Sequence, residues 1–265
     1  MTKGLWKMIL TADNYEELIS TIESLDALDP FACRIISLCT SYQPVLPFVD
    51  YWTVFDDKTK NPTGAIARNG TDFILFLTDK SDINEVSSFM RVAGAASVIC
   101  SNKYNLDLFG YEKSHGPILV RTEEISENDS LIIDTPKIKE AYELIAKAAD
   151  KYFTPPKFED FYVDINHKLR HGTMRLLGLY DENNLATVAM TVAESKQGAV
   201  IGAVACLPKF RNKGYGTYIV NHLTNILVKE GKRVFVHRAE QANKAFYDYL
   251  KFKCFDSWSE YHFKG

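Results

Sequence analysis

The sequence has little that would direct it to a membrane, to nucleic acid or out of the cell. Its apolar runs are short, as Phe73–Leu77 shows, so no segment is expected to cross a bilayer. The net charge is −3, and no long basic or acidic block indicates a nucleic-acid partner. The first ten residues lack a long apolar core with a small-residue cleavage site, so no secretion signal is expected. We therefore expect a cytoplasmic protein without nucleic-acid or membrane partners.

Paired cysteines are also lacking. The five cysteines form no Cys-x-x-Cys pair, and they are Cys33, Cys39, Cys100, Cys206 and Cys254. An odd, scattered set argues against a disulfide framework and against a zinc site. Five histidines, at 115, 167, 171, 222 and 262, show no metal-ligand spacing, and no spacing favours a Cys–His nucleophile. We expect reduced core thiols and no metal.

What is present is an ordinary composition and an alternation of strands and helices in the C-terminal half. The chain has 265 residues, of which 46% are hydrophobic, so it can form one large domain or two smaller ones. Thr135 is expected to cap a helix that Pro136 opens, and Gly231 is expected to end another. Strands are predicted at 131–134, 175–180, 185–194, 199–207, 233–237 and 254–263, and helices at 135–150, 217–230 and 243–250. The pattern predicts an α/β fold.

The N-terminal half repeats this order more faintly. Two helical stretches fall between residues 15 and 40, and a further helix is predicted at 82–92. Strands are predicted at 51–55, 64–68, 73–77, 97–100 and 118–121. We interpret the chain as a diverged duplication, with a linker near 123–130 and domains at 1–125 and 129–265.

The segment that carries chemistry runs from Cys206 to Thr217, where a predicted strand enters a glycine-containing loop that opens into a helix. The first turn of a helix has unpaired N–H groups and the positive end of the helix dipole. Gly214 and Gly216 remove side chains where a phosphate would approach the backbone. Arg211 and Lys213 add positive charge. The segment therefore predicts an anion site.

The same short pattern, Arg-x-x-Gly-x-Gly/Ala, occurs a second time at Arg91–Ala96. That copy lies at the end of a predicted helix rather than between a strand and a helix. We interpret it as a helix stop at Gly94. Only the 211–216 copy has the context that a phosphate loop requires.

At these residues the sequence resembles the GNAT superfamily of acetyl-coenzyme A-dependent N-acetyltransferases, over about 129–265. The positions that match the family's proline, aromatic, Arg/Gln and two loop glycines are Pro208, Phe210, Arg211, Gly214 and Gly216. The resemblance implies a mixed, splayed sheet flanked by helices, and the repeated order implies tandem GNAT-like (acyl-CoA N-acyltransferase) domains. The segment Thr78–Ile83 stands where the phosphate loop would be in the N-terminal copy. Its Asp79 and Asp82 would cap a helix but repel a pyrophosphate, so that copy is interpreted as degenerate.

The resemblance also implies which residues hold acetyl-CoA or coenzyme A as co-substrate. Backbone N–H groups from 212 to 217 would hold the pyrophosphate, and the pantetheine would lie against the strand that ends at Cys206. A backbone amide there would polarise the thioester carbonyl. The implied cofactor-binding residues are Val204, Ala205, Cys206, Arg211, Asn212, Lys213, Gly214, Tyr215, Gly216, Thr217 and Asn243.

The family commonly has a tyrosine four residues before a Gly-Phe pair. Tyr247 matches this tyrosine, since it precedes Lys251-Phe252, in which lysine replaces the glycine. The resemblance implies that Tyr247 is the catalytic acid. The family often has an asparagine seven residues before this tyrosine; Glu240 occupies that position, and Asn243 is the nearest asparagine. Glu194 and His237 fall near predicted strand ends and are candidates for the base.

The resulting expectation is an enzyme, an N-acyltransferase that moves an acyl group, acetyl in the first instance, from acetyl-CoA to a primary amine by direct attack. The acceptor is a small-molecule or peptide amine, and the protein is a monomer or a homodimer. One alternative is a non-catalytic acyl-CoA-binding sensor or scaffold with the same fold. A second is amino-acid transfer from an aminoacyl-tRNA, which would require a basic groove that the overall charge does not indicate.

Overall fold

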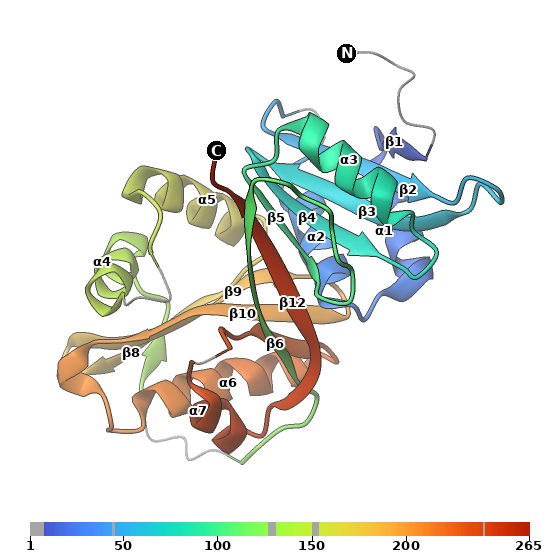
Figure 1. Ribbon diagram of the computed structural model, residues 1–265. Coiled ribbons are helices and arrows are strands. Elements are labelled where there is room, and N and C mark those ends of the chain that lie inside the picture. Colours follow the sequence, from blue (N-terminus) through green and yellow to red (C-terminus); the bar gives the residue numbers. More distant parts are fainter. Residues whose placement is uncertain (1–7, 44–45, 127–130, 150–153, 241) are drawn as a thin grey trace. The chain divides into compact units, whose positions relative to one another are not determined.

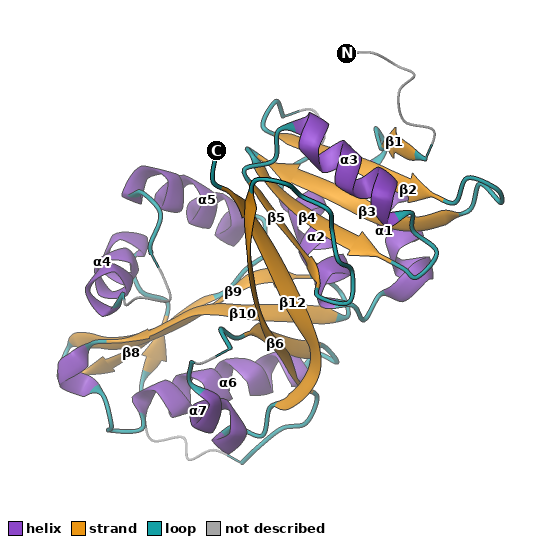
Figure 2. Cartoon of the chain, in the orientation of Figure 1, coloured by secondary structure: helices purple, strands orange, loops and turns teal. Residues whose placement is uncertain are grey.

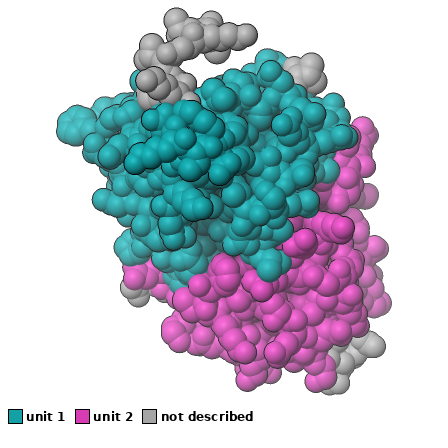
Figure 3. Space-filling model, turned by 90° about the vertical axis from the view of Figure 1, so that its right-hand side faces the viewer, with its two compact units in different colours: residues 1–118, 256–265 teal, residues 119–255 magenta. Residues whose placement is uncertain are grey.

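The computed structural model describes residues 8–43, 46–126, 131–149, 154–240 and 242–265. The chain divides into two compact units, which Figure 3 shows in different colours. Unit 1 comprises residues 1–118 and 256–265, and unit 2 comprises residues 119–255. The boundaries therefore differ from the expected domains at 1–125 and 129–265, because the last ten residues belong to unit 1.

Unit 1 contains a mixed sheet with helices on both of its faces (Figures 1 and 2). The strands lie in the order β1-β2-β3-β4-β5-β12-β6. Strands β1 to β4 pair antiparallel, and β5 runs parallel to β4 because helix α3 carries the chain between them. The elements are β1 (Ile9–Thr11), α1 (Tyr15–Asp26), α2 (Pro30–Ser41), β2 (Val49–Phe55), β3 (Pro62–Asn69), β4 (Asp72–Leu77), α3 (Ile83–Ala93), β5 (Ser97–Ser101), β6 (Tyr111–Arg121) and β12 (Lys253–Phe263). The end of β6, residues 119–121, and the start of β12, residues 253–255, belong to unit 2.

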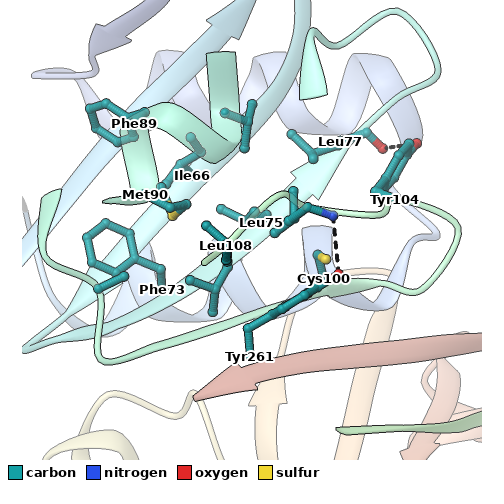
Figure 4. Packing of buried hydrophobic residues seen from close by; sticks show 14 of the residues in the cluster. Ile66, Phe73, Leu75, Leu77, Phe89, Met90, Cys100, Tyr104, Leu108 and Tyr261 are labelled. Atoms are coloured by element: carbon teal, nitrogen blue, oxygen red, sulfur yellow. Dashed lines mark hydrogen bonds between the residues drawn. The ribbon is translucent and has the colours of Figure 1, made fainter. Parts of the chain in front are cut away.

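The core of unit 1 is completed by the C-terminal strand (Figure 4). Strand β12 pairs antiparallel with β5, and its Tyr261 is only 4% exposed within the apolar cluster under α3. The backbone N–H of Leu106 donates to the Tyr261 hydroxyl over 3.2 Å, and the Tyr104 hydroxyl donates to the Leu77 carbonyl over 2.8 Å. These two tyrosines satisfy their polar ends while burying their rings. Residues at the end of the sequence are thus part of the first unit's core.

Unit 2 contains the strands β11, β10, β9, β8 and β7, which lie in that order along the sheet. Helix α6 packs on one face, where it contacts Ala186 and Ala189 of β9, and helices α4 and α5 pack on the other, around Val188 and Met190. The elements are β7 (Ile133–Asp134), α4 (Ile138–Ala148), α5 (Phe158–Arg170), β8 (Leu176–Asp181), β9 (Asn184–Glu194), β10 (Gly198–Cys206), a 3-10 turn (Pro208–Phe210), α6 (Tyr215–Lys229), β11 (Arg233–His237) and α7 (Lys244–Tyr249).

The sheet of unit 2 splays between β10 and β11. The two strands pair in parallel only from Gly198 to Ile201 on β10, although β10 continues to Cys206. On its other side β10 bulges, because two of its residues, Ala203 and Val204, lie opposite a single residue of β9. The expected mixed, splayed sheet flanked by helices is confirmed.

Helix ends follow the sequence in some places and depart from it in others. Gly231 has a φ of +80° directly after α6, as expected of a helix stop. Thr135 is not a cap: α4 begins at Ile138, and no side chain caps it. Helix α6 begins at Tyr215 rather than Thr217, so the preceding loop is shorter than expected. Residue 150, the expected end of the first helix, lies outside the described residues.

Cysteines and helices in the described part of the chain give no sign of a disulfide, a metal cluster or a membrane span. None of the five cysteines is in a disulfide; Cys33, Cys39 and Cys100 are buried, as expected of core thiols, whereas Cys254 is exposed. Burial raises the pKa of Cys39 and of Cys100 to about 12. Within the described ranges no group of His, Cys, Asp and Glu side chains could hold a metal ion, and no helix has the length and apolarity to cross a bilayer.

Candidate functional site

The loop between β10 and α6 forms an uncapped helix N-terminus. Gly214 is the N-cap residue of α6 with a φ of +84°, and no side chain bonds to the first-turn N–H groups. Asn212 also has a positive φ, of +62°. A side chain at Gly214 would meet no atom within 4 Å, so it is the backbone conformation that requires glycine there. The loop therefore presents unpaired donors and the positive end of the dipole to an anion.

A cavity of about 440 Å³ opens beside this loop in unit 2. All of the predicted cofactor-binding residues except Lys213 line it, together with Tyr247. The complete lining is Ala148, Val204, Ala205, Cys206, Phe210, Arg211, Asn212, Gly214, Tyr215, Gly216, Thr217, Asn243, Phe246 and Tyr247. The structure thus brings the end of β10, the loop, the first turn of α6 and helix α7 together around one space.

Lys213 lies outside that lining because it is held by the β8–β9 hairpin. Its ammonium lies 3.1 Å from the Asp181 carboxylate, to which the Tyr215 hydroxyl also donates over 2.9 Å. These hydrogen bonds, from Tyr215 first and then from Lys213, lower the pKa of Asp181. The positive charge expected of Lys213 is therefore partly neutralised, and the residue braces the loop against the hairpin.

Arg211 does line the cavity and ties the loop to the strand before it. Its Nε donates to the Cys206 carbonyl over 3.2 Å, while the side chain remains exposed. Cys206 is half-buried, and burial raises the pKa of its thiol. The thiol is therefore kept in its neutral form, which is a poor nucleophile.

The bulge of β10 forms the opposite wall. Ala203 has a φ of +46°, a strained conformation for a residue with a side chain. Beyond Ile201 the strand no longer pairs with β11, and at Ala203 and Val204 it cannot pair residue for residue with β9. The Ala205 carbonyl is bound by the Thr187 hydroxyl over 2.7 Å, which fixes the strand after the bulge. The bulge thus interrupts the regular pairing of β10 at residues that border the cavity.

Tyr247 is a buried tyrosine at the edge of this space. It is 8% exposed, and its ring makes edge contacts with Phe246 and Phe252. Within the described residues its hydroxyl has no hydrogen-bond partner. Burial raises the pKa of Tyr247 to about 12, an effect that the positive charge of Arg238 partly opposes. The hydroxyl therefore stays protonated at neutral pH and can act as a proton donor.

The two candidates for a base lie in very different places. Glu194 is 6% exposed at the hairpin end of β9, where it pairs opposite Ala199, several residues from the bulge. Its carboxylate is bound by Lys232 over 2.6 Å and by the Thr191 hydroxyl over 2.8 Å. Glu194 is therefore held in a structural ion pair, so it is not available to act as the base. His237, at the end of β11, lines a second, smaller cavity that also borders Tyr247.

The corresponding loop of unit 1 has the opposite chemistry. Asp82 is the N-cap of α3, and its carboxylate accepts hydrogen bonds from the backbone N–H groups of Asn84 and Glu85. A negative charge thus occupies the place that an anion would take, as the sequence predicted. The second copy of the short pattern ends α3 at Gly94, which has a φ of +69°, so its interpretation as a helix stop is confirmed.

Three residues of the lining were missed by the sequence reasoning as site residues. Phe246 precedes Tyr247 on the same short helix, and Phe210 belongs to the matched motif, so both had a signal in the sequence. Ala148 comes from the end of α4, far from the motif along the chain. No local pattern could indicate that an alanine there reaches the cavity.

Comparison with known families gives a match in sequence over part of the chain. A family model described as FR47-like protein matches residues 176–261, from the start of β8 into β12. This range contains the loop, the bulge and Tyr247. The sequence has no match among curated proteins.

Solved structures show the fold over nearly the whole chain. A tandem GNAT protein from the clavulanic acid biosynthesis pathway aligns with a TM-score of 0.59 at 14% identity, covering 96% of this chain and 97% of that one. A GNAT-family acetyltransferase from Colwellia psychrerythraea aligns with a TM-score of 0.56 at 12% identity, covering 97% and 99%. A GCN5-related N-acetyltransferase from Kribbella flavida aligns with a TM-score of 0.56 at 14% identity, covering 89% and 94%. At these identities the likeness establishes the fold, and the expected tandem arrangement is confirmed.

Proposed function

We propose that unit 2 is an N-acyltransferase. The chain has the tandem GNAT fold, and its residues 176–261 match the FR47-like family. It binds acetyl-CoA in the cavity of about 440 Å³ and transfers the acyl group to a primary amine. The acceptor is a small-molecule or peptide amine, and no nucleic acid takes part. Unit 1, with Asp82 at its own helix start, has a supporting role.

One observation carries the proposal. A single cavity is lined by an uncapped helix N-terminus, a bulged strand end and the buried Tyr247. The helix N-terminus suits a pyrophosphate, since its N–H groups have no side-chain cap at Gly214. The bulged end of β10 suits the extended, amide-containing pantetheine arm, and its backbone suits polarisation of the thioester carbonyl. These are the three groups that a coenzyme A thioester presents.

The fit of the lining to this co-substrate is chemical as well as geometric. Arg211 supplies a positive charge at the loop, and no carboxylate side chain lines the cavity among the described residues. Gly216 keeps the first turn of α6 free of side-chain bulk. When bound, the co-substrate supplies an activated acyl carbon and a thiolate leaving group.

The residues of the chain then have separate tasks. Backbone N–H groups at the bulge stabilise the negative charge that develops on the carbonyl oxygen. The amine nitrogen bonds to the acyl carbon, the carbon–sulfur bond breaks, and the Tyr247 hydroxyl gives its proton to the departing sulfur. We assign to His237, which lines the adjoining cavity, the proton that the amine loses, because a neutral imidazole can accept a proton. No covalent enzyme intermediate is needed, which agrees with the neutral thiol of Cys206.

The test has two stages on the full chain. Calorimetric titration with acetyl-CoA should show one site per chain, and release of free thiol should then depend on added amine. Binding without thiol release for any amine would instead support the sensor alternative. Absence of acetyl-CoA binding by the folded protein would overturn the proposal altogether.

A further inference from the structure

The phosphate loop of unit 2 holds one of its cations outside the cavity of about 440 Å³. Asn212 and Gly214 line that cavity, whereas the side chain of Lys213, which lies between them, is paired with Asp181 of the β8–β9 hairpin over 3.1 Å. The lysine side chain is 50% exposed and the aspartate side chain 21%. An exposed ion pair of this kind contributes little to stability, so breaking it costs little. Lys213 is therefore a cation that a ligand at the rim of the loop can take over.

Asp181 keeps a hydrogen-bond partner when Lys213 leaves it. The same carboxylate oxygen, Oδ2, also accepts from the hydroxyl of Tyr215, the first residue of α6, over 2.9 Å. This hydrogen bond is the main cause that raises the pKa of Tyr215, so the hydroxyl remains protonated and continues to donate. The bond between Tyr215 and Asp181 alone ties the start of α6 to the hairpin. Release of Lys213 thus leaves the helix start in place.

A second lysine lies beside the first. The ammonium of Lys209 is 4.6 Å from the centre of the Phe210 ring, and the ammonium of Lys213 is 5.2 Å from the centre of the same ring. Both lysines are exposed. Two like charges near one ring repel each other, and a doubly charged anion that binds both relieves this repulsion. A phosphate monoester, with a charge of about −1.5 to −2 near neutral pH, suits two such flexible point charges.

The order of groups in coenzyme A brings a phosphate monoester to this rim. The pantetheine arm lies against β10 and the pyrophosphate at the start of α6 in the proposed function, so the adenosine end continues beyond the loop. Its ribose carries a monoester phosphate at the 3′ position. On the basis of the proposed function, we propose that Lys213 passes from Asp181 to this 3′-phosphate when the co-substrate binds, with Lys209 as the second cation. Asp181 is then a positioning residue that holds Lys213 beforehand and competes with the ligand for it.

The first experiment compares two ligands that differ only in this phosphate. Calorimetric titration of the full chain should show coenzyme A binding roughly 10-fold more tightly than 3′-dephospho-coenzyme A. Lys213→Gln should lower that ratio to near one. Lys229→Gln is the matched control, since it removes the same charge from the last turn of α6, where Lys229 pairs with Glu124 over 3.5 Å, and it should keep the ratio.

The outcomes of this titration separate the two proposals. Equal affinity of the wild type for both ligands would overturn the 3′-phosphate inference and leave the acyltransferase proposal standing. A wild-type ratio that survives in Lys213→Gln would overturn the role of Lys213. If neither ligand binds to the folded chain, the acyltransferase proposal fails as well.

The second experiment tests whether Asp181 competes for the lysine. Asp181→Asn keeps an oxygen for the Tyr215 hydroxyl but loses the charge, so it should bind coenzyme A roughly 3–10-fold more tightly, with a smaller gain for 3′-dephospho-coenzyme A. Glu182→Gln removes a charge from the same hairpin and measures the general effect of that loss, because Glu182 also acts electrostatically on Lys213. In the Lys213→Gln background the gain from Asp181→Asn should fall to that of Glu182→Gln. A carboxylate that only braces the loop would give the opposite sign, so weaker binding of both ligands, or an equal gain for both, would overturn the role of Asp181.

Discussion

Tyr247 shows at the scale of one residue how burial creates a proton donor. Tyr247 lines both cavities, and its pKa of about 12 keeps its hydroxyl protonated where most enzymes work. We predict that Tyr247→Phe keeps acetyl-CoA binding and lowers kcat by roughly 10²–10⁴-fold, the usual contribution of a positioned acid. Tyr249→Phe is the control, because that side chain is 73% exposed. A crippled Tyr249→Phe beside a normal Tyr247→Phe would show that the acid has been misassigned.

The wild-type pH profile gives an independent check on the same residue. The side chain is neutral below its pKa, so the acid form persists up to about pH 12. We therefore expect no fall in kcat between pH 8 and pH 10 from ionisation of Tyr247. The measurement is single-turnover thiol release across that range, with acetyl-CoA saturating. A decline centred near pH 10, absent in Tyr247→Phe, would contradict the raised pKa.

The buried N-cap residue Asp29 is the basis of a prediction about the stability of the fold. It caps helix α2 by accepting from the N–H groups of Phe31 and Ala32, over 2.7 and 3.1 Å. Burial is the main cause that raises its pKa to about 6. A carboxyl with a raised pKa stabilises the fold fully below its unfolded value, near 3.8, and loses that contribution as the pH rises through 6.

We therefore expect Asp29→Asn, which keeps the capping oxygen without the charge, to be more stable than the wild type at pH 7. The difference should be roughly 1–2 kcal/mol, less than the full shift implies because the side chain is half-buried. At pH 3.5 the two proteins should unfold alike. Urea unfolding at both pH values is the measurement, and a wild type that is more stable at pH 7 would contradict the prediction.

At the scale of an element, the first turn of α6 separates binding from folding. A side chain at Gly216 would approach the Phe246 ring at 3.6 Å, an ordinary contact, and its φ is not in the left-handed region. A glutamate there also suits the positive helix end. We predict that Gly216→Glu folds normally but weakens acetyl-CoA binding roughly 100-fold, equivalent to about 2.7 kcal/mol, because the carboxylate competes with the pyrophosphate.

Gly216→Ala is the matched control, since it adds the same Cβ without charge and should bind nearly as the wild type does. Calorimetry measures the affinity and circular dichroism the fold. Gly214 is a poorer place for this test, because its φ of +84° would strain any other residue. Unchanged affinity in Gly216→Glu would show that the loop does not hold the phosphates.

The sequence predicts those features of these elements that depend on neighbouring residues. The conformational demands at Gly94, Gly214 and Gly231, and the cap at Asp82, follow from residues within one turn of a helix end. The position of Lys213 does not, because its partner Asp181 sits on a hairpin more than thirty residues earlier. Glu194 is likewise neutralised by a lysine that no local pattern connects to it.

At the scale of the whole molecule, the order of strands and helices indicated a duplication, but it did not show where each half begins and ends. Strand β12 was assigned to the second half because it follows α7 directly. It pairs instead with β5, over 150 residues earlier, and buries Tyr261 in the first unit's core. The pairing partner of a strand depends on contacts far along the chain, and alternation of apolar residues carries no information about it.

Arg121 extends the same argument to the other boundary. It is 2% exposed, and its guanidinium donates to Asn221 over 2.8 Å, to Asn225 over 2.6 Å and to the Leu250 carbonyl over 3.2 Å. The expected domain at 129–265 lacks this arginine, whereas unit 2 at 119–255 contains it. Each buried acceptor left without a donor costs about 1–3 kcal/mol, a large part of the roughly 5–15 kcal/mol that stabilises a domain.

We therefore predict that a fragment of residues 119–255 unfolds cooperatively and binds acetyl-CoA nearly as tightly as the full chain. A fragment of residues 129–265 should be less stable by several kcal/mol, because it loses Arg121 and carries β12 without its partner β5. Urea unfolding and calorimetry compare the two. Arg121→Gln within 119–255 separates the causes, since it should reproduce only the part of the loss that comes from the buried guanidinium. Equal stability of the two fragments would mean that neither Arg121 nor the position of β12 defines the second unit.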